Sequence, residues 1–310
     1  MLISICIPAY KNLFFVERLL NSIAIQTFRD FEVVITDDSP DDELKNYISN
    51  YFSDFTINYV KNTTALGTPE NWNESIKYAK GKWIKLMHDD DWFANENSLA
   101  VFAKQTEVND AYFIISAYTN IYLDENKTEL VIAKPFSFRF WHLKKNRASL
   151  LSKNIIGPPS VVMHKNDAKI FYDKQFKWLV DIDFYYHVIS SKQILYIQQA
   201  LINVGLSKEQ VTRSCFRIAA VEIPEYFYFM NKIGCDNLKN ILVYDAMWRL
   251  FRNLEIKNEQ DIVDAGYFGK IELSILAIIQ FQNKIPNKFL KIGVLSKILM
   301  LIHYLFVRKK

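Results

Sequence analysis

Four short apolar segments alternate with three amphipathic ones over the first 87 residues, and this alternation constrains the fold more than any other feature. The short segments are rich in isoleucine, valine and aromatic residues, as buried parallel strands are: residues 2–7, 31–36, 56–60 and 82–87. The segments between them repeat apolar residues at helical spacing: residues 13–26, 42–52 and 69–80. This order predicts an α/β fold with a doubly wound, largely parallel sheet. We expect Pro8 to end the first strand, because proline has no N–H to donate.

The chain beyond residue 98 is less regular. Further helices are expected at residues 99–107 and 181–189. Further strands are expected at residues 111–118, 161–164 and 194–197. From about residue 218, apolar-rich segments with helical spacing dominate. We therefore predict two domains: an α/β domain over residues 1–215 and a helical C-terminal region over residues 216–310.

The composition limits the classes of function. The chain has 310 residues and is 50% hydrophobic, which is enough for a large globular core. The formal net charge of +4 is small and gives no reason to expect nucleic acid as a partner. Cys6, Cys215 and Cys235 are too widely spaced for a zinc motif or a disulfide framework. Because the apolar N-terminus lacks the features of a signal peptide, we expect a cytoplasmic protein.

Acidic residues directly follow two of the predicted strands. Asp37 and Asp38 follow residues 31–36, and Asp89, Asp90 and Asp91 follow residues 82–87. Because the carboxyl ends of parallel strands share one edge, both groups are expected to face one crevice. Carboxylates so close together repel unless a cation neutralises them, and oxygen ligands favour Mg²⁺, Mn²⁺ or Ca²⁺ over Zn²⁺. The alternative is that Asp37, Asp38 and Asp91 only cap helices.

Several motifs then follow one another in order: Ile5–Tyr10, Gln26–Ser39, Leu66–Gly67, Asn71–Asn73, Ala79–Lys85 and His88–Asp91. Together they resemble the family-two inverting glycosyltransferases, and the resemblance covers residues 2–210. That family has the GT-A fold and uses nucleotide-diphosphate sugars, so the resemblance implies a hexosyltransferase-type enzyme with a UDP-sugar as donor.

The resemblance assigns roles to residues of the N-terminal half. Pro8, Tyr10 and Asp38 match positions that hold the nucleotide, with Asp38 as the partner of the base, and Asn71 belongs to the same donor site. Asp90 matches the last residue of the DxD motif, whose carboxylate coordinates a metal, so Mn²⁺ or Mg²⁺ is the implied cofactor. His88 stands at the first DxD position, which is a departure from the family pattern.

The departure at His88 leaves two interpretations open. Its imidazole contacts the ribose or diphosphate of the donor, or it is a structural histidine at the end of a strand. Asp89 is assigned to the donor, and Asp91 is a supporting carboxylate.

Residues 177–185 resemble the family segment that carries the catalytic base, and the spacing of apolar residues places the base at Asp181. The family often has Glu before this Asp, where Val180 stands here. A helix N-cap is the alternative for Asp181. Asp183 is expected to point elsewhere on the helix and to support or cap it. Trp178 stacks on a sugar or packs in the core.

Two loops complete the predicted site. Gly157–Ser160 resembles an acceptor-side loop, although it is equally consistent with a simple turn. Leu206–Arg213 resembles a segment that closes over the diphosphate, with Lys208 or Arg213 as the phosphate partner. An ordinary solvated loop is the alternative.

The C-terminal tail combines an apolar run at residues 298–307 with basic residues on both sides: Lys288, Lys291, Lys297, Arg308, Lys309 and Lys310. Ten residues cannot cross a bilayer, which needs about 20. The pattern indicates an amphipathic helix on the inner face of the cell membrane. The alternative is a helix packed on the domain or on a second copy, as in a homodimer.

These observations predict an inverting, metal-dependent enzyme that moves a sugar from a UDP-sugar to a glycan on a lipid carrier, in surface polysaccharide biosynthesis. A non-catalytic nucleotide-sugar or glycan-binding module is the alternative, favoured if His88 abolishes metal binding. A nucleotidyltransferase is disfavoured, because Pro8–Asn12 contains no glycine-rich phosphate loop.

Overall fold

The chain divides into two compact units that interleave in sequence. The structure is a computed structural model that describes residues 1–108, 111–125, 127–132, 138–167, 170–189, 193–207 and 215–307. The first unit comprises Met1–Phe136, Ile156–Lys174 and Asp183–Gln210, and the second comprises Ser137–Ile155, Gln175–Ile182 and Val211–Lys310. The division into domains at residues 215 and 216 stays a prediction.

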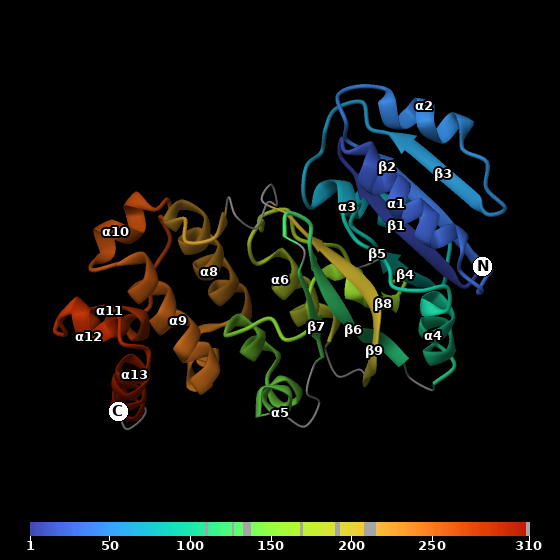
Figure 1. Cartoon of the computed structure of the whole chain (residues 1–310). Helices are drawn as coiled ribbons and strands as arrows, with labels where there is room; N and C mark the ends of the chain where they lie inside the picture. Colours follow the sequence, from blue (N-terminus) through green and yellow to red (C-terminus); the bar gives the residue numbers. More distant parts are fainter. Residues whose placement is uncertain are drawn as a thin grey trace. The chain divides into compact units, whose positions relative to one another are not determined.

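A mixed sheet forms the core of the first unit (Figure 1). Within the described residues it has nine strands: β1 (Ile3–Ala9), β2 (Phe31–Asp37), β3 (Thr56–Lys61), β4 (Trp83–Leu86), β5 (Trp92–Phe93), β6 (Ala111–Tyr122), β7 (Lys127–Val131), β8 (Val162–Lys165) and β9 (Gln193–Leu206). Their order is β3-β2-β1-β4-β8-β6-β9-β5, and β7 pairs with β6. The predicted α/β class is confirmed.

The four predicted N-terminal strands make the parallel half of the sheet. β1 pairs with β2 on one side and with β4 on the other, and β3 lies beyond β2. Every residue of β1, β2 and β4 is buried, which explains why their sequences are mostly apolar. The helices between them also form as predicted: α1 (Leu13–Ala24), α2 (Glu43–Asn50) and α3 (Glu70–Tyr78).

The expectation that Pro8 ends the first strand is wrong. β1 continues to Ala9, and Pro8 stands opposite Thr36 of β2. On its other side β1 pairs with β4 only from Ile3 to Cys6. Since β4 does not reach Pro8, the strand tolerates a residue without an N–H at this position.

The other half of the sheet is longer than its sequence suggests. β9 extends over 14 residues and β6 over 12, and they pair in parallel. The predicted strand stopped at Ile197 because Gln198 and Gln199, which are exposed, interrupt the apolar run. β5 has two residues and β7 is mostly exposed, so neither carries a burial pattern in its sequence. α4 (Ser98–Gln105) and α6 (Val180–Val188) form where helices were predicted.

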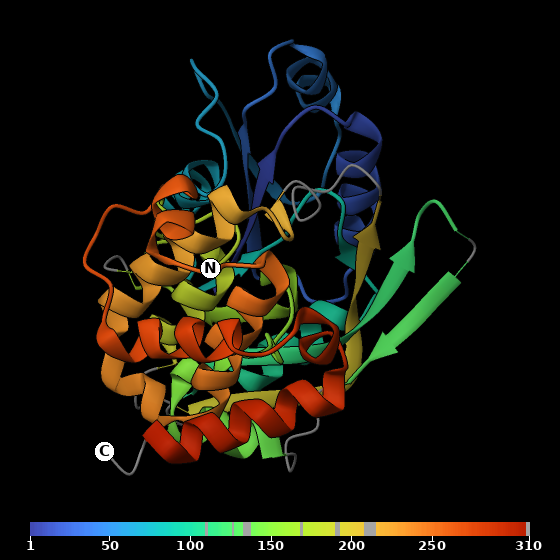
Figure 2. The ribbon, with the colours of Figure 1, turned by 90° about the vertical axis from the view of Figure 1, so that its left-hand side faces the viewer.

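The second unit is mainly helical (Figure 2). Its described elements, besides the start of α6, are α5 (Phe138–Lys145), η1 (Arg147–Leu151), α8 (Ala219–Ile233), η3 (Cys235–Lys239), α9 (Ile241–Leu254), α10 (Glu259–Asp264), α11 (Leu273–Asn283), α12 (Asn287–Leu290) and α13 (Gly293–Val307). The predicted helical C-terminal region is thus present. α9 is central, since it contacts α8, α11 and α13 and fully buries Trp248 and Phe251. In the part of the chain that the structure describes, no helix combines the length and apolarity needed to span a bilayer.

Candidate active site

The ends of β1, β2 and β4 bring the two acidic groups to one edge of the sheet. The Asp38 N–H donates to the carbonyl of Ala9 at 3.0 Å. On the other side of the same short segment, the Tyr10 N–H donates to Asp89 Oδ2 at 3.4 Å. Asp38 and Asp89 therefore flank the end of β1, as the parallel order of these strands predicted.

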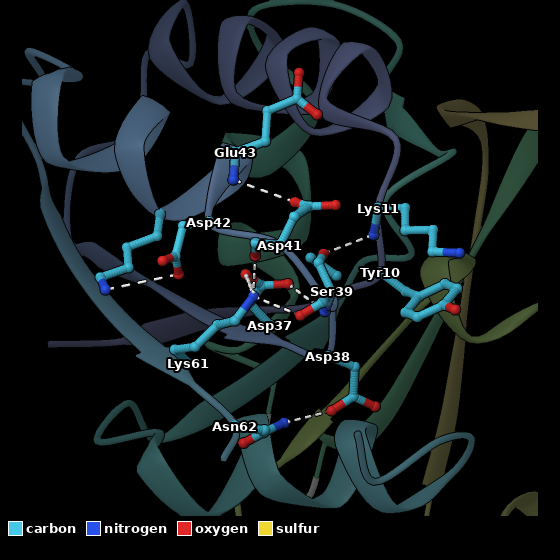
Figure 3. A network of polar contacts seen from close by, with 12 residues as sticks. Tyr10, Lys11, Asp37, Asp38, Ser39, Asp41, Asp42, Glu43, Lys61 and Asn62 are labelled. Carbon is cyan, nitrogen blue, oxygen red and sulfur yellow. Dashed lines mark hydrogen bonds and ion pairs between the residues drawn. The ribbon is translucent and has the colours of Figure 1, made fainter. Parts of the chain in front are cut away.

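Asp37 does not take part in this crevice, which corrects the expectation that both neighbouring carboxylates face it. Its carboxylate is buried and accepts hydrogen bonds from Ser39 N at 2.7 Å and from Lys61 Nζ at 3.0 Å (Figure 3). Tyr59 Oη also donates to it, at 2.7 Å. Burial alone would raise the pKa of Asp37, but these hydrogen bonds outweigh it and lower the pKa. Asp37 is thus a structural carboxylate that joins β2 to β3.

Asp38 holds the loop between β3 and α3. Oδ1 accepts from Asn62 Nδ2 at 2.7 Å and Leu66 N at 3.0 Å, and Oδ2 accepts from Gly67 N at 2.8 Å. Figure 3 shows Asp38 directed toward Asn62 and away from Lys61. The loop that Asp38 fixes borders the end of β2, where the donor site was predicted.

Asn71 joins this loop to the strand ends. Its Nδ2 donates to the carbonyls of Ala9 at 3.3 Å and Thr36 at 3.1 Å, and its Oδ1 accepts from Asn62 Nδ2 at 2.9 Å. The side chain is buried, and both the nitrogen and the oxygen of its amide have hydrogen-bond partners. Asn71 therefore shapes the donor side of the edge by holding backbone in place.

His88, Asp90 and Asp91 form a compact cluster after β4. One ligand atom from each lies within 4.8 Å of the others, and His88 Nδ1 is 4.0 Å from Asp91 Oδ2. His88 Nε2 is buried without a hydrogen-bond partner among the described residues. Two carboxylates and an imidazole are a donor set that suits a divalent cation, and the imidazole fits Mn²⁺ better than Mg²⁺. The structure thus groups His88 with the carboxylates, whereas the sequence indicated a contact with the donor or a structural role.

Three neighbours hold the backbone and one side chain of this cluster in place. Ser160 Oγ accepts from His88 N at 3.0 Å, and Asp91 Oδ1 accepts from Gly205 N at 3.0 Å. Arg18 Nη2 donates to the carbonyl of Asp90 at 2.7 Å. A Cβ at Gly205 would collide with that same carbonyl, so glycine is needed there. Sequence reasoning missed Arg18 and Gly205, since neither lies in a motif of its own.

Burial and mutual repulsion dominate the electrostatics of the cluster. Burial, aided by the charge of Asp90, raises the pKa of Asp89 to about 7 and also raises the pKa of Asp91. Burial lowers the pKa of His88, which favours the neutral imidazole that metal ions bind. The fully buried Lys85 donates to the carbonyl of Ser160, and burial lowers its pKa to about 7.

The 157–160 loop supports this cluster. Pro159–Val161 form a short 3₁₀ helix, and Ser160 in it is fully buried. Tyr185 Oη donates to the carbonyl of Gly157 at 3.0 Å. Within the first unit, the contacts of this loop therefore support the residues after β4.

Asp181 lies in the first turn of α6 and is partly exposed. Its Oδ2 accepts from Asn154 Nδ2 at 2.6 Å and its Oδ1 accepts from Ile182 N at 2.8 Å. Burial raises the pKa of Asp181 to about 6, and these hydrogen bonds oppose the rise. Because α6 begins at Val180, Asp181 is within the helix, which does not fit the N-cap alternative.

Glu225 of α8 anchors the segment before Asp181. Its carboxylate is buried and accepts from the N–H groups of Lys177 at 2.8 Å, Trp178 at 2.9 Å and Leu179 at 2.8 Å. One side chain of α8 thus accepts hydrogen bonds from the three backbone N–H groups that directly precede α6. Sequence reasoning missed Glu225; an acidic residue inside an apolar helix was the signal, but its partners are 46 to 48 residues away.

The remaining predicted residues occupy varied positions. Asp183 is buried, and its Oδ1 lies 3.5 Å from His187 Nδ1. Trp178 is partly exposed, and its ring centroid is 5.8 Å from that of Phe216. Lys208 and Arg213 lie outside the described residues.

Comparison with known proteins identifies the family of the chain. The sequence model described as glycosyl transferase family 2 matches residues 4–171, which is more than half of the chain. The chain belongs to glycosyl transferase family 2. It is therefore a transferase enzyme, and its first unit has the fold of that family.

Glycosyltransferases of other organisms resemble the chain over different shares of its length. An uncharacterized glycosyltransferase of Methanocaldococcus jannaschii is 23% identical over 282 residues, 90% of this chain and 87% of the relative. The UDP-Glc:alpha-D-GlcNAc-diphosphoundecaprenol beta-1,3-glucosyltransferase WfaP of Escherichia coli is 30% identical over 137 residues, 44% of this chain and 51% of WfaP.

Two solved structures share the fold. The crystal structure of S. aureus TarS 1-349 in complex with UDP-GlcNAc superposes with a TM-score of 0.64 at 18% identity, covering 98% of this chain and 89% of the 1-349 chain. The mannosyltransferase PcManGT of Pyrobaculum calidifontis, in complex with GDP-Man and Mn²⁺, gives a TM-score of 0.56 at 13% identity, covering 98% and 84%. At these identities the likeness establishes the GT-A fold alone.

Proposed function

We propose that the protein is an inverting, metal-dependent glycosyltransferase that moves a sugar from a UDP-sugar to a lipid-linked saccharide. The observation that carries the proposal is the cluster of His88, Asp90 and Asp91, which lies at the same sheet edge as Tyr10 and Asp38. A cation site beside a nucleotide site is the arrangement that a sugar diphosphate requires. The mannosyltransferase with the same fold binds GDP-Man and Mn²⁺, which supports this assignment.

In this proposal the donor's nucleotide lies against the ends of β1 and β2. The ring of Tyr10 is 52% exposed, so it is free to stack on a base. Asp38 provides a fixed carboxylate for the base, because the loop holds both of its oxygens in place. Pro8 and Asn71 shape this wall from the buried side. The choice of UDP rests on TarS, which has the same fold and binds UDP-GlcNAc.

Asp90 is the proposed principal metal ligand, and His88 and Asp91 complete the donor set, with Asp89 beside it. A bound Mn²⁺ or Mg²⁺ would neutralise the negative charge that develops on the departing diphosphate. Ser160 and Gly205 hold the two ends of the cluster, so the ligands are oriented before the cation binds. Lys208 and Arg213 remain proposed phosphate partners.

Asp181 is the proposed base that takes the proton of the attacking acceptor hydroxyl on the opposite face of the sugar. Asn154 and the Ile182 N–H each occupy one of its oxygens and leave lone pairs for the proton. Trp178 and Asp183 are proposed to support the acceptor side. The acceptor class rests on WfaP, whose name specifies a GlcNAc-diphosphoundecaprenol acceptor.

A panel of nucleotide-diphosphate sugars tests the donor side of the proposal. Thermal unfolding is measured with UDP-, GDP- and dTDP-sugars, with and without Mn²⁺. We expect a UDP-sugar with Mn²⁺ to raise the melting temperature most, since a ligand at 100 times its Kd stabilises by about 2.7 kcal/mol. Chelation of the metal should remove most of the shift. If no donor shifts the transition under either condition, the donor site is wrongly assigned.

The pKa of Asp181 sets an expected pH dependence. Below about pH 6 the carboxyl is protonated and cannot accept the proton of the acceptor hydroxyl; above it, the carboxylate is available. The value of kcat/KM should therefore fall about tenfold for each pH unit below 6 and level off at higher pH. Because this pKa is that of the protein without substrate, kcat/KM is the quantity measured against pH, with thermal unfolding recorded at each pH. A rate that stays constant between pH 5 and pH 7 would contradict the assignment of the base.

A further inference from the structure

Helix α13 is fixed to the second unit by one of its faces (Figure 2). Ser296, Met300, His303 and Tyr304 are buried on this face. Trp248 Nε1 donates to Ser296 Oγ at 3.0 Å, and the Tyr304 Oη donates to the carbonyl of Lys239 at 2.6 Å. These hydrogen bonds show that α13 packs on its own chain, as one of the predicted alternatives stated. They leave the opposite face to be explained.

The outer face of α13 is a continuous apolar stripe. Its large side chains are 41% to 74% exposed: Val294, Ile298, Leu301, Ile302, Leu305 and Phe306. The spacing places all six on one side of the helix, at 100° per residue. Among the described residues of this face, Lys297 is the charged one. Surfaces of soluble proteins rarely carry so much contiguous apolar area unless it binds something.

The charge around the stripe identifies the partner. From Leu273 to the end of the sequence there is no Asp or Glu, while Lys and Arg occur repeatedly: Lys284, Lys288, Lys291, Lys297, Arg308, Lys309 and Lys310. A second copy of this chain would bring the same positive charges against one another. An anionic phospholipid surface instead offers both negative headgroups and an apolar layer.

We propose that the outer face of α13 binds an anionic membrane surface, with the helix lying in the interface. The proposal deepens the proposed function, because it places the enzyme where a lipid-linked acceptor would be. It rests on the exposed stripe and its charge, and the vesicle measurement below does not depend on catalysis. The 15 residues of α13 extend about 22 Å, which suits a helix lying in the interface.

The test is sedimentation of the full chain with vesicles of phosphatidylcholine alone or of phosphatidylcholine mixed with phosphatidylglycerol. We expect the protein to bind the anionic vesicles and to be released by high salt, since the Debye length falls from about 10 Å at 0.1 M to about 3 Å at 1 M. The triple variant I298Q/I302Q/L305Q should lower the bound fraction at least about tenfold, because three apolar side chains leave the interface. The double variant K288E/K297E should weaken binding to the anionic vesicles selectively.

A matched control removes an exposed apolar side chain elsewhere. Phe52→Gln, at a position that is 96% exposed in the first unit, should bind vesicles like the unaltered protein. All variants should keep the melting temperature and the turnover with a water-soluble acceptor. Equal binding of the triple variant and the unaltered protein, equal binding to both vesicle types, or a dimer that the triple variant dissociates would overturn the proposal. If the unaltered protein binds the anionic vesicles but transfers no sugar, that result would instead count against the proposed function.

Discussion

Asp181→Asn should lower the turnover of sugar transfer by about 10²–10⁴-fold, because that is the usual contribution of a general base. The asparagine amide has the size of the carboxylate and can keep a hydrogen bond with Asn154, yet it cannot accept the proton of the acceptor hydroxyl. Donor affinity should survive, since Asp181 is assigned to the acceptor side. Turnover at saturating donor and the melting shift caused by the donor are the two measurements.

Two further variants make this result interpretable. Asp183→Asn removes the other carboxylate of α6, and Asp236→Asn removes an exposed carboxylate of the second unit that pairs with Lys239. Asp236→Asn should retain full turnover, and Asp183→Asn should lose less than Asp181→Asn because Asp183 only supports the acceptor side. The acidic limb of the pH profile should disappear in Asp181→Asn alone. Near-normal turnover of Asp181→Asn would remove Asp181 from the base role. A large loss in Asp183→Asn at unchanged stability would transfer that role to Asp183.

The parallel half of the sheet was predictable because three of its strands, β1, β2 and β4, are buried on both faces. A mostly apolar run such as β1 or β2 has few other structural interpretations when helical segments separate the runs. β9 was predicted too short for the opposite reason. Exposed glutamines interrupt its apolar run, and its pairing with β6 depends on residues more than 80 positions away.

The two carboxylates after β2 show where a motif stops being informative. Asp37 and Asp38 are adjacent, and successive side chains of an extended chain point to opposite sides. Which of them faces the crevice is decided by Tyr59 and Lys61 of β3, which bind Asp37, and by the loop at Gly67, which binds Asp38. The family resemblance selected Asp38, whereas strand-end position alone favoured neither.

The cluster after β4 shows a similar limit. His88 and Asp91 are three positions apart, and only the chain's local conformation decides whether their side chains meet. The Asp91 N–H donates to the carbonyl of His88 at 3.1 Å, so the segment forms a turn and brings the two side chains together. A sequence comparison marks His88 as a missing carboxylate, but the turn makes it a candidate ligand.

Asp90→Asn should lower turnover by about 10²–10³-fold, because a bound cation contributes several kcal/mol of charge stabilisation and each 1.36 kcal/mol is about tenfold in rate. The amide keeps the shape of the side chain but loses the negative charge that attracts the ion. Mn²⁺ binding, measured by titration calorimetry or electron paramagnetic resonance, should weaken in parallel. The metal-dependent part of the thermal shift with the donor should shrink as well.

Asp42→Asn is a suitable control, since it removes an exposed carboxylate of the same unit that pairs with Lys45. It should keep both turnover and Mn²⁺ affinity. His88→Ala adds a second test of the donor set: if the imidazole is a ligand, Mn²⁺ should bind more weakly to this variant. Unchanged Mn²⁺ affinity in Asp90→Asn would exclude Asp90 as a metal ligand. If Asp90→Asn binds Mn²⁺ more weakly but keeps its turnover, the cluster has no part in catalysis. The charge on the departing diphosphate would then be stabilised without the metal of this cluster.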